Sequence, residues 1–166
     1  MPNIHKNELA LAGEFLVLAH LSSKGYVATL TLGHTKSIDI LLTNQETGKL
    51  FKVEVKTTSN GTTGSRHFGN NIEWMMDMKH EKIDDKNLFY CFVQLEGGKL
   101  DKPRFFIVPS NKVAKFVKDD DAYYNRLPHR RPVKQTAMRL FKIGIDDNSR
   151  GLPANNYENK WDYFDR

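Results

Sequence analysis

The chain has 166 residues, with 25 Lys or Arg against 20 Asp or Glu, and it contains one cysteine. A single cysteine excludes an internal disulfide and a cysteine-rich zinc site. The length suits one domain over residues 1–166, with a core at about 8–119 and a basic extension at about 120–166. The small excess of positive charge is compatible with binding to a polyanion but does not establish it.

Neither a secretion signal nor a membrane span is predicted. The N-terminus lacks a long apolar core followed by a small-residue cleavage site. The longest apolar stretch, from Leu9 to Leu21, is interrupted by Glu14 and His20 and is shorter than the ~20 residues that a membrane span needs. We therefore expect a protein of the cytoplasm, which agrees with the lone cysteine.

The first half of the chain predicts a helix and then three strands. Residues 8–24 contain good helix formers, with Asn7 available as an N-cap and Gly25 as a stop. Three segments rich in β-branched and aromatic residues follow: 26–32, 37–43 and 49–58. The sequence NQETG separates the last two segments and suits a hairpin turn, so we expect the three strands to form a meander.

The second half predicts further helices and strands. Residues 59–71 are rich in Gly, Ser, Thr and Asn and indicate a mobile loop, whereas residues 72–84 have the composition of a helix. Residues 88–95 are apolar on both faces, which is typical of a strand inside a sheet. The remaining elements are a strand at 104–108, a helix at 109–119 and a candidate strand at 138–145. The order through residue 119 is therefore α-β-β-β-α-β-β-α.

Glu14 is an unusual residue in the first predicted helix. Its neighbours one turn away are Ala10, Leu11, Val17 and Leu18, and the whole helix is so apolar that we expect it to be buried. A buried carboxylate needs an arginine or lysine, a hydrogen-bond network or a metal ion. The alternative is that Glu14 reaches solvent through a local gap.

Asp39 is a second unusual acid, because Asp is depleted in strands and this one lies between two isoleucines. A hairpin folded about residues 46 and 47 places Asp39 opposite Glu54, where two like charges need a cation between them. Mg²⁺ takes carboxylate, carbonyl and water oxygens and would serve. A shifted register instead places Asp39 opposite Lys56, with which it would form a cross-strand salt bridge on a solvated face.

The combination of Glu14 in GE, Asp39 in IDIL and Glu54 with Lys56 in EVK resembles the PD-(D/E)xK, or restriction-endonuclease-like, nuclease superfamily. The resemblance covers about residues 8–95. It implies an α/β (α+β mixed) fold with an α-β-β-β-α-β core, in which helices flank a central mixed sheet. Ile38 stands where the name of the superfamily implies Pro, which lowers the specificity of the match without removing a catalytic group.

The resemblance implies a metal-dependent endonuclease that hydrolyses phosphodiester bonds in DNA. Asp39, Glu54 and the main-chain carbonyl of Val55 would bind Mg²⁺, or Mn²⁺ in its place, and Glu14 would complete the site. Lys56 would orient the attacking water or stabilise the developing charge. Two alternatives stay open. One is a catalytically silent nuclease-fold subunit that binds DNA in a defence, repair or mobile-element complex. The other is an unrelated α+β protein whose polar strand face carries only salt bridges.

Two segments are candidates for holding DNA. Arg66 and His67 lie in the predicted loop after the proposed catalytic strand, and loops beside rigid strands often bind ligands. Residues 126–142 are rich in Lys and Arg and include no acidic residue, and the candidate phosphate contacts among them are Arg130, Arg131, Lys134 and Arg139. Each segment could instead be ordinary solvated surface. These residues specify neither the bases that are read nor the oligomeric state, so a homodimer stays an open alternative.

Overall fold

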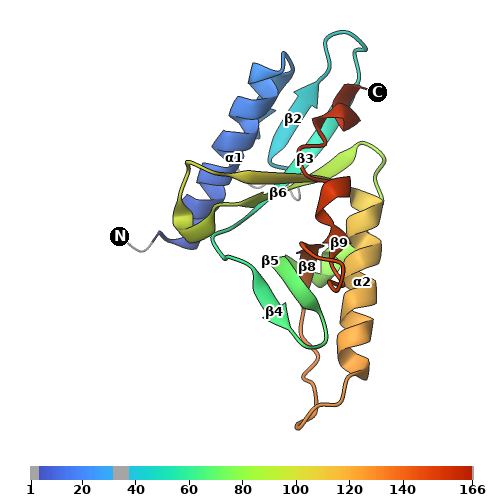
Figure 1. The fold of residues 1–166 in the computed structure, drawn as a ribbon. Helices are drawn as coiled ribbons and strands as arrows, with labels where there is room; N and C mark the ends of the chain where they lie inside the picture. Colours follow the sequence, from blue (N-terminus) through green and yellow to red (C-terminus); the bar gives the residue numbers. More distant parts are fainter. Residues whose placement is uncertain (1–3, 32–37, 166) are drawn as a thin grey trace.

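The structure is a computed structural model that describes residues 4–31 and 38–165 (Figure 1). Its long helices are α1 (Lys6–Ser23) and α2 (Ser110–Arg126). Its strands are β1 (Val27–Leu30), β2 (Ile40–Thr43), β3 (Leu50–Thr58), β4 (Thr63–Ser65), β5 (Gly69–Asp77), β6 (Leu88–Gln94), β7 (Arg104–Pro109), β8 (Met138–Gly144) and β9 (Leu152–Pro153). Short 3-10 turns are η1 (Met78–Lys82), η2 (Glu96–Gly98), η3 (Ala154–Asn156) and η4 (Trp161–Asp165). Neither α1 nor any other helix in the described ranges has the length and apolar character that a transmembrane segment requires.

The main sheet has five strands in the order β1-β2-β3-β6-β7. The first three strands pair antiparallel as the predicted meander, β6 lies parallel to β3, and β7 is antiparallel to β6. Every residue of β6 is buried, which confirms the interior position predicted for this apolar segment. The predicted strand ends at Leu32 and Ser37 lie outside the described residues.

Residues 59–84 do not form the predicted loop and helix. They form β4 and β5, which belong to a second sheet of order β4-β5-β8-β9, and the short turn η1. From Ile72 onward the buried residues of β5 are Ile72, Trp74 and Met76, which is the period of a strand rather than of a helix. β5 pairs with β8, so the candidate strand at 138–145 is confirmed. The helix prediction was wrong because the partner strand lies far along the chain, where local composition cannot reveal it.

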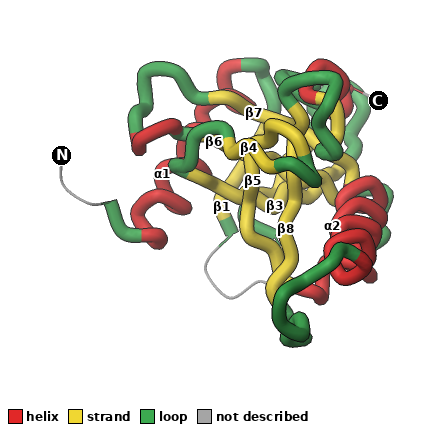
Figure 2. The backbone as a smooth tube through the Cα atoms, turned by 60° about the horizontal axis from the view of Figure 1, so that its bottom comes forward, coloured by secondary structure: helices red, strands yellow, loops and turns green. Residues whose placement is uncertain are grey.

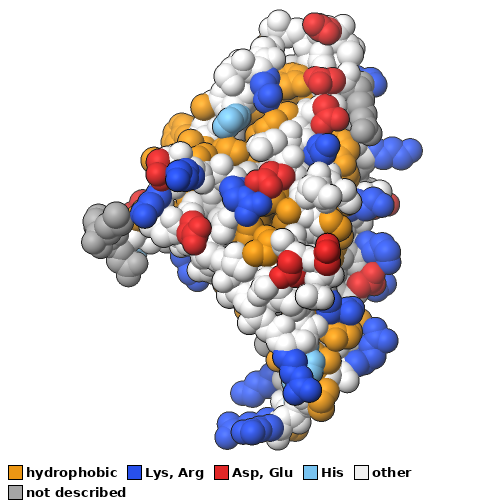
Figure 3. All heavy atoms as spheres, in the orientation of Figure 1, with side chains coloured by type: hydrophobic (Ala, Val, Ile, Leu, Met, Phe, Trp, Pro, Cys, Tyr) orange, Lys and Arg blue, Asp and Glu red, His pale blue; other side chains and the backbone are white. Residues whose placement is uncertain are grey.

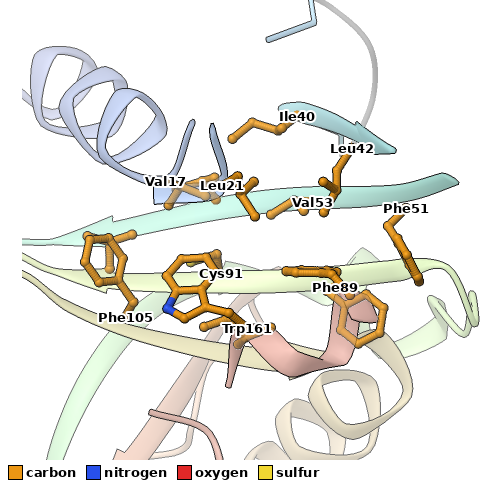
Figure 4. Packing of buried hydrophobic residues seen from close by; sticks show 14 of the residues in the cluster. Val17, Leu21, Ile40, Leu42, Phe51, Val53, Phe89, Cys91, Phe105 and Trp161 are labelled. Atoms are coloured by element: carbon orange, nitrogen blue, oxygen red, sulfur yellow. The ribbon is translucent and has the colours of Figure 1, made fainter. Parts of the chain in front are cut away.

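The first hydrophobic core lies between α1 and one face of the main sheet and is closed by the C-terminus (Figure 4). Trp161 and Phe164 are buried in it, so the C-terminal aromatic residues pack onto the rest of the chain. α1 contributes Val17 and Leu21 to this core from one side only. The prediction that the whole helix is buried was wrong, because the opposite side leaves apolar residues such as Phe15 exposed at 52%.

The second core fills the other face of the main sheet, beneath β5, β8 and α2. The rings of Phe92 and Phe141 stack there with their centroids 3.9 Å apart. Neighbouring residues of a strand point to opposite faces, so β6 serves both cores: Cys91 enters the first, and Tyr90 and Phe92 enter the second. Figures 1 and 2 accordingly show α1 and α2 on opposite sides of the strands.

Candidate active site

The hairpin of β2 and β3 fixes the position of Asp39. The Asp39 amide donates to the Val53 carbonyl at 2.9 Å, and the pairing of the two strands places Asp39 opposite Glu54. The alternative register, with Asp39 opposite Lys56, is not formed. One carboxylate oxygen of Asp39 accepts a 2.7 Å hydrogen bond from the Val55 amide. Asp39 thereby satisfies a backbone donor of β3 where the ladder to β2 ends, and this bond holds its carboxylate against the strand.

Glu54 and Lys56 lie on the same face of β3 and form an ion pair, with Nζ of Lys56 2.6 Å from Oε1 of Glu54. The side chain of Glu54 is 3% exposed, whereas that of Lys56 reaches solvent. The second oxygen of Glu54, Oε2, is buried, and no described residue gives it a hydrogen bond. A buried polar atom without a partner costs about 1–3 kcal/mol, and more when it is charged. This oxygen is therefore suited to receive a cation or a water molecule.

Two buried side chains that the sequence interpretation missed lie behind Glu54. The Tyr90 hydroxyl is 2.7 Å from Nδ1 of His80, and Nε2 of His80 is 3.8 Å from Oε1 of Glu54. Burial lowers the pKa of His80. Burial, and then the charge of Glu54, raise the pKa of Tyr90. Both side chains are therefore neutral near pH 7, and they enclose the carboxylate of Glu54 without neutralising it.

Tyr90 carried a usable signal in the sequence. β6 pairs in parallel with β3, and Tyr90 lies directly opposite Glu54 in that pairing. A strand that follows a catalytic strand in parallel can therefore be searched for polar groups on the shared face. His80 carried no such signal, because its position depends on η1 after β5, and this part of the chain has the composition of a helix.

α1 brings Glu14 to the same region through a close approach to β3. A Cβ atom on Gly13 would lie 1.9 Å from Oγ1 of Thr57, so a residue with a side chain at this position would push α1 away from β3. Partial burial, and then the negative charge of Asp39, raise the pKa of Glu14, while Lys56 lowers it. Glu14 is therefore within electrostatic range of both residues. Glu14 is only partly buried, which agrees with the alternative stated above that its carboxylate reaches solvent.

The pKa of Asp39 shows the same shared environment. Burial is the largest cause and raises this pKa, and the charge of Glu54 raises it further. The hydrogen bond from Val55 and the charge of Lys56 oppose the rise. The structure therefore brings Glu14, Asp39, Glu54 and Lys56 into one electrostatic neighbourhood, in which the negative charges exceed the single positive one.

The residues present fit a divalent cation, although the described ranges contain no group of three or more His, Cys, Asp and Glu side chains arranged as metal ligands. Lys56 occupies one oxygen of Glu54, which leaves the unpartnered Oε2 of Glu54 and the carboxylate of Asp39 as hard oxygen donors. Mg²⁺ is commonly held by one or two carboxylates together with waters and substrate phosphates. Two carboxylates on paired strands meet that requirement.

The candidate DNA contacts fall into two exposed places. Arg66 and His67 are exposed in the turn between β4 and β5. Arg130, Arg131 and Lys134 are exposed in the segment between α2 and β8, which projects from the rest of the molecule (Figure 1). Figure 3 shows Lys and Arg side chains gathered at this projecting end. We call residues 127–137 the basic segment below.

Arg139 does not belong to this exposed surface, so its placement among the candidate phosphate contacts requires a correction. It is 9% exposed, Nε is bonded to Glu81, and Nη1 lies 3.5 Å from Asp121. Lys142 is likewise buried and paired with Asp120. The stretch 126–142 contains no acid, but the fold supplies acidic partners from η1 and α2. These two cations are therefore neutralised inside the protein.

No protein family and no curated protein matches this sequence. Among solved structures, the chain is similar to the bacterial homing endonuclease I-Ssp6803I, with a TM-score of 0.52 and 15% sequence identity. The similarity covers 95% of this chain and 89% of that one. At this identity the likeness concerns the fold alone: the chain shares the mixed α/β arrangement described above with that endonuclease.

Proposed function

We propose that this protein is a metal-dependent endonuclease of the PD-(D/E)xK superfamily that hydrolyses phosphodiester bonds in DNA. The observation that carries the proposal is the position of Asp39, just before β2, opposite Glu54 of β3 and next to Lys56, with one buried oxygen of Glu54 that receives no hydrogen bond from the described residues. The likeness in fold to a homing endonuclease supports the same class of reaction.

In this proposal Asp39 and Glu54 hold Mg²⁺ or Mn²⁺, together with the main-chain carbonyl of Val55. When bound, such a cation polarises the scissile phosphate and lowers the pKa of a water molecule. The carboxylate of Glu14 lies close enough to Asp39 to feel its charge, so it completes the negative site either directly or through a water. His80 and Tyr90 limit the space in which the Glu54 carboxylate can move.

Lys56 supplies the positive charge that belongs to the protein itself. Its ammonium group is partly exposed, and its flexible stem allows it to turn from Oε1 of Glu54 towards a phosphate oxygen or a water. In that position it orients the attacking water or stabilises the negative charge that develops on the phosphate. The same lysine also prevents Glu54 from being an isolated buried anion while the protein is free of metal.

The proposal is tested with purified protein, Mg²⁺ or Mn²⁺, and a panel of duplex, single-stranded, branched and modified DNAs. We expect metal-dependent cleavage of at least one of them. Asp39→Asn should lower its rate roughly 10³-fold, while the exposed Asp101→Asn, which makes the same chemical change, should leave the rate unchanged. Absence of cleavage across the panel, or cleavage that is unchanged in Asp39→Asn, would contradict the proposal.

A second candidate function is a nuclease-fold DNA-binding subunit without turnover. It is favoured by the 2.6 Å ion pair in which Lys56 takes one oxygen of Glu54, and by the lack of a preformed group of three ligands in the described ranges. Such a subunit would bind DNA in a salt-sensitive manner, and the binding would survive Glu54→Gln. Metal-dependent cleavage by the wild-type protein would reject this candidate.

A further inference from the structure

Glu73 is a carboxylate that its neighbours leave without a partner. It lies in the middle of β5 on the face turned away from the second core, and Lys142 is the residue opposite it on β8. Lys142 does not neutralise it, because its ammonium group is bonded to Asp120 and lies 3.8 Å from the centre of the Phe68 ring. In residues 4–31 and 38–165, no hydrogen bond or ion pair engages the side chain of Glu73.

Two hollows meet at Glu73. One, of about 420 Å³, is lined by Lys6, Lys56, Ser59 and Asn60 and therefore adjoins the candidate active site. The other, of about 540 Å³, is lined by Arg131, Lys134 and Gln135 of the basic segment. Asp120 and Asp121 also line it, but their charges are paired with Lys142 and Arg139. Glu73 and Leu140 line both hollows, so the outer face of β5 and β8 lies between Lys56 and the basic segment.

Positive charges lie at both ends of this face and the negative charge of Glu73 lies between them, so phosphates and bases are expected to contact different parts of it. Lys6 and Lys56 at one end and Arg131 and Lys134 at the other suit phosphate groups. The carboxylate of Glu73, which lies between them, repels phosphate. DNA that crosses this face is therefore bound more favourably when its bases, and not its phosphates, face Glu73. An ionised carboxylate only accepts hydrogen bonds, and in the major groove the base groups that donate them are the amino groups of cytosine and adenine.

The rest of the face suits the same occupant. Met75, two residues after Glu73 and therefore on the same face of β5, is 61% exposed, and Leu140 lies opposite it on β8. Apolar side chains on paired strands can contact base edges and the thymine methyl group, and the major groove is wide enough to admit a two-stranded ribbon. An exposed apolar strip beside an unpaired acid has no evident role in stabilising the fold.

We propose that the outer face of β5 and β8 reads base edges in the major groove of duplex DNA, and that Glu73 is a specificity-determining residue that selects cytosine or adenine at one strand position. This inference rests on the proposed function, because it takes DNA as the substrate. Where no base donor faces Glu73, its negative charge weakens the binding of DNA. Where an amino group of the selected base faces it, a hydrogen bond offsets this cost, and the difference gives discrimination between sequences.

The test compares wild type with Glu73→Ala and Glu73→Gln, in Ca²⁺ so that DNA can bind without being cut. The probes are a mixed-sequence duplex and a pool of duplexes with a randomised central region. Glu73→Ala should bind the mixed duplex roughly two- to tenfold more tightly, because a repelling charge is gone. Duplexes selected from the pool by wild type should favour C or A at one strand position. Glu73→Ala should lose that preference, which corresponds to roughly 5- to 100-fold discrimination, and Glu73→Gln should shift it to adenine, to which a glutamine amide both donates and accepts.

Glu46→Ala and Glu46→Gln are matched controls, because Glu46 is exposed in the turn between β2 and β3, at the other end of the molecule from the basic segment (Figure 1). They remove the same charge and should change neither affinity nor selected sequence. The inference is overturned if the Glu73 variants select the same sequences as wild type with the affinity of the Glu46 variants. Glu73→Gln keeps the shape of the side chain, so it preserves the test if Glu73→Ala folds poorly.

Failure of this inference can be told from failure of the proposed function. A wild-type protein that cleaves DNA in Mg²⁺ while its Glu73 variants behave like the Glu46 controls rejects only the role of Glu73. A wild-type protein that neither binds nor cleaves any DNA rejects the proposed function, and the role of Glu73 falls with it.

Discussion

Two groups of buried charges lie near the second core, and they differ in how completely they are paired. Arg139 donates from Nε to Glu81, and its Nη1 lies near Asp121 and donates to the carbonyls of Thr136 and Met138. Around Glu54 the pairing is incomplete, because one of its oxygens has no partner among the described residues. Fully paired buried charges can be explained by the fold alone. A buried carboxylate oxygen without a partner among the described residues is available to a ligand or a water from outside the chain.

Among the substitutions that test this comparison, Asp39→Asn should have the largest effect, and the quantity that it changes is the rate of DNA cleavage. The substitution keeps the size of the side chain and an oxygen that can accept from the Val55 amide, but it removes a negative charge opposite Glu54. We expect the rate of DNA cleavage to fall roughly 10³-fold, about 4 kcal/mol of activation free energy. Initial rates at saturating Mg²⁺ measure this, with a thermal unfolding curve close to that of wild type.

A substitution of Arg139, in the more completely paired group, should lower the stability of the protein. Arg139→Ala leaves Glu81 without its partner in a largely buried setting, so the free energy of unfolding should fall by about 3 kcal/mol. Urea denaturation measures this change. The exposed Arg130→Ala is the control and should change stability by less than about 0.5 kcal/mol. If the two substitutions lowered the free energy of unfolding equally, the ion pairs of buried Arg139 would not contribute more to stability than exposed Arg130 does.

Glu54→Gln should have a small effect on the stability of the metal-free protein. The change removes a buried charge whose second oxygen is unpaired, but it also deprives Lys56 of its ion pair. We expect these terms to cancel to within about 1 kcal/mol. Addition of Mg²⁺ should raise the melting temperature of wild type and not that of the variant. A melting temperature that rises equally in both proteins would show that Glu54 does not hold the ion.

The smallest effect is a pH dependence of stability caused by Asp39 and Glu14. Their pKa values are raised in the folded protein, so in the window above 3.8 for Asp39 and above 4.5 for Glu14 the folded state binds more protons than the unfolded state. Without metal, their contribution to the free energy of unfolding should therefore decrease as the pH rises through that window. Asp39→Asn should flatten this part of the profile, as measured by urea denaturation at a series of pH values. A steeper profile in the variant would contradict the assignment.

The local features of the site could be predicted from the sequence. The turn at residues 46 and 47 determines the register that places Asp39 opposite Glu54, because pairing in a hairpin follows from its turn. The helix that carries Glu14 and the buried strand β6 were also evident from composition and periodicity. Each of these inferences needed only neighbouring residues or one short connection.

Features that depend on distant partners could not be predicted. β5 was mistaken for a helix because its Trp and Met residues also suit a helix, and its pairing with β8 is made across a long stretch of chain. His80 and Glu73 are positioned by that strand, so neither could be recognised. Arg139 looked like part of a basic surface because Glu81 and Asp121, its partners, belong to other segments.

The position of Cys91 gives the protein an internal reporter of its own unfolding. This thiol lies in the middle of β6, the strand that serves both cores, and it is 1% exposed. Burial raises its pKa, so the thiolate that reacts with alkylating reagents is scarce as long as the strand stays covered. Labelling of the native protein therefore requires β6 to open, and because the chain has no second cysteine, the labelling rate measures that event without any engineered probe.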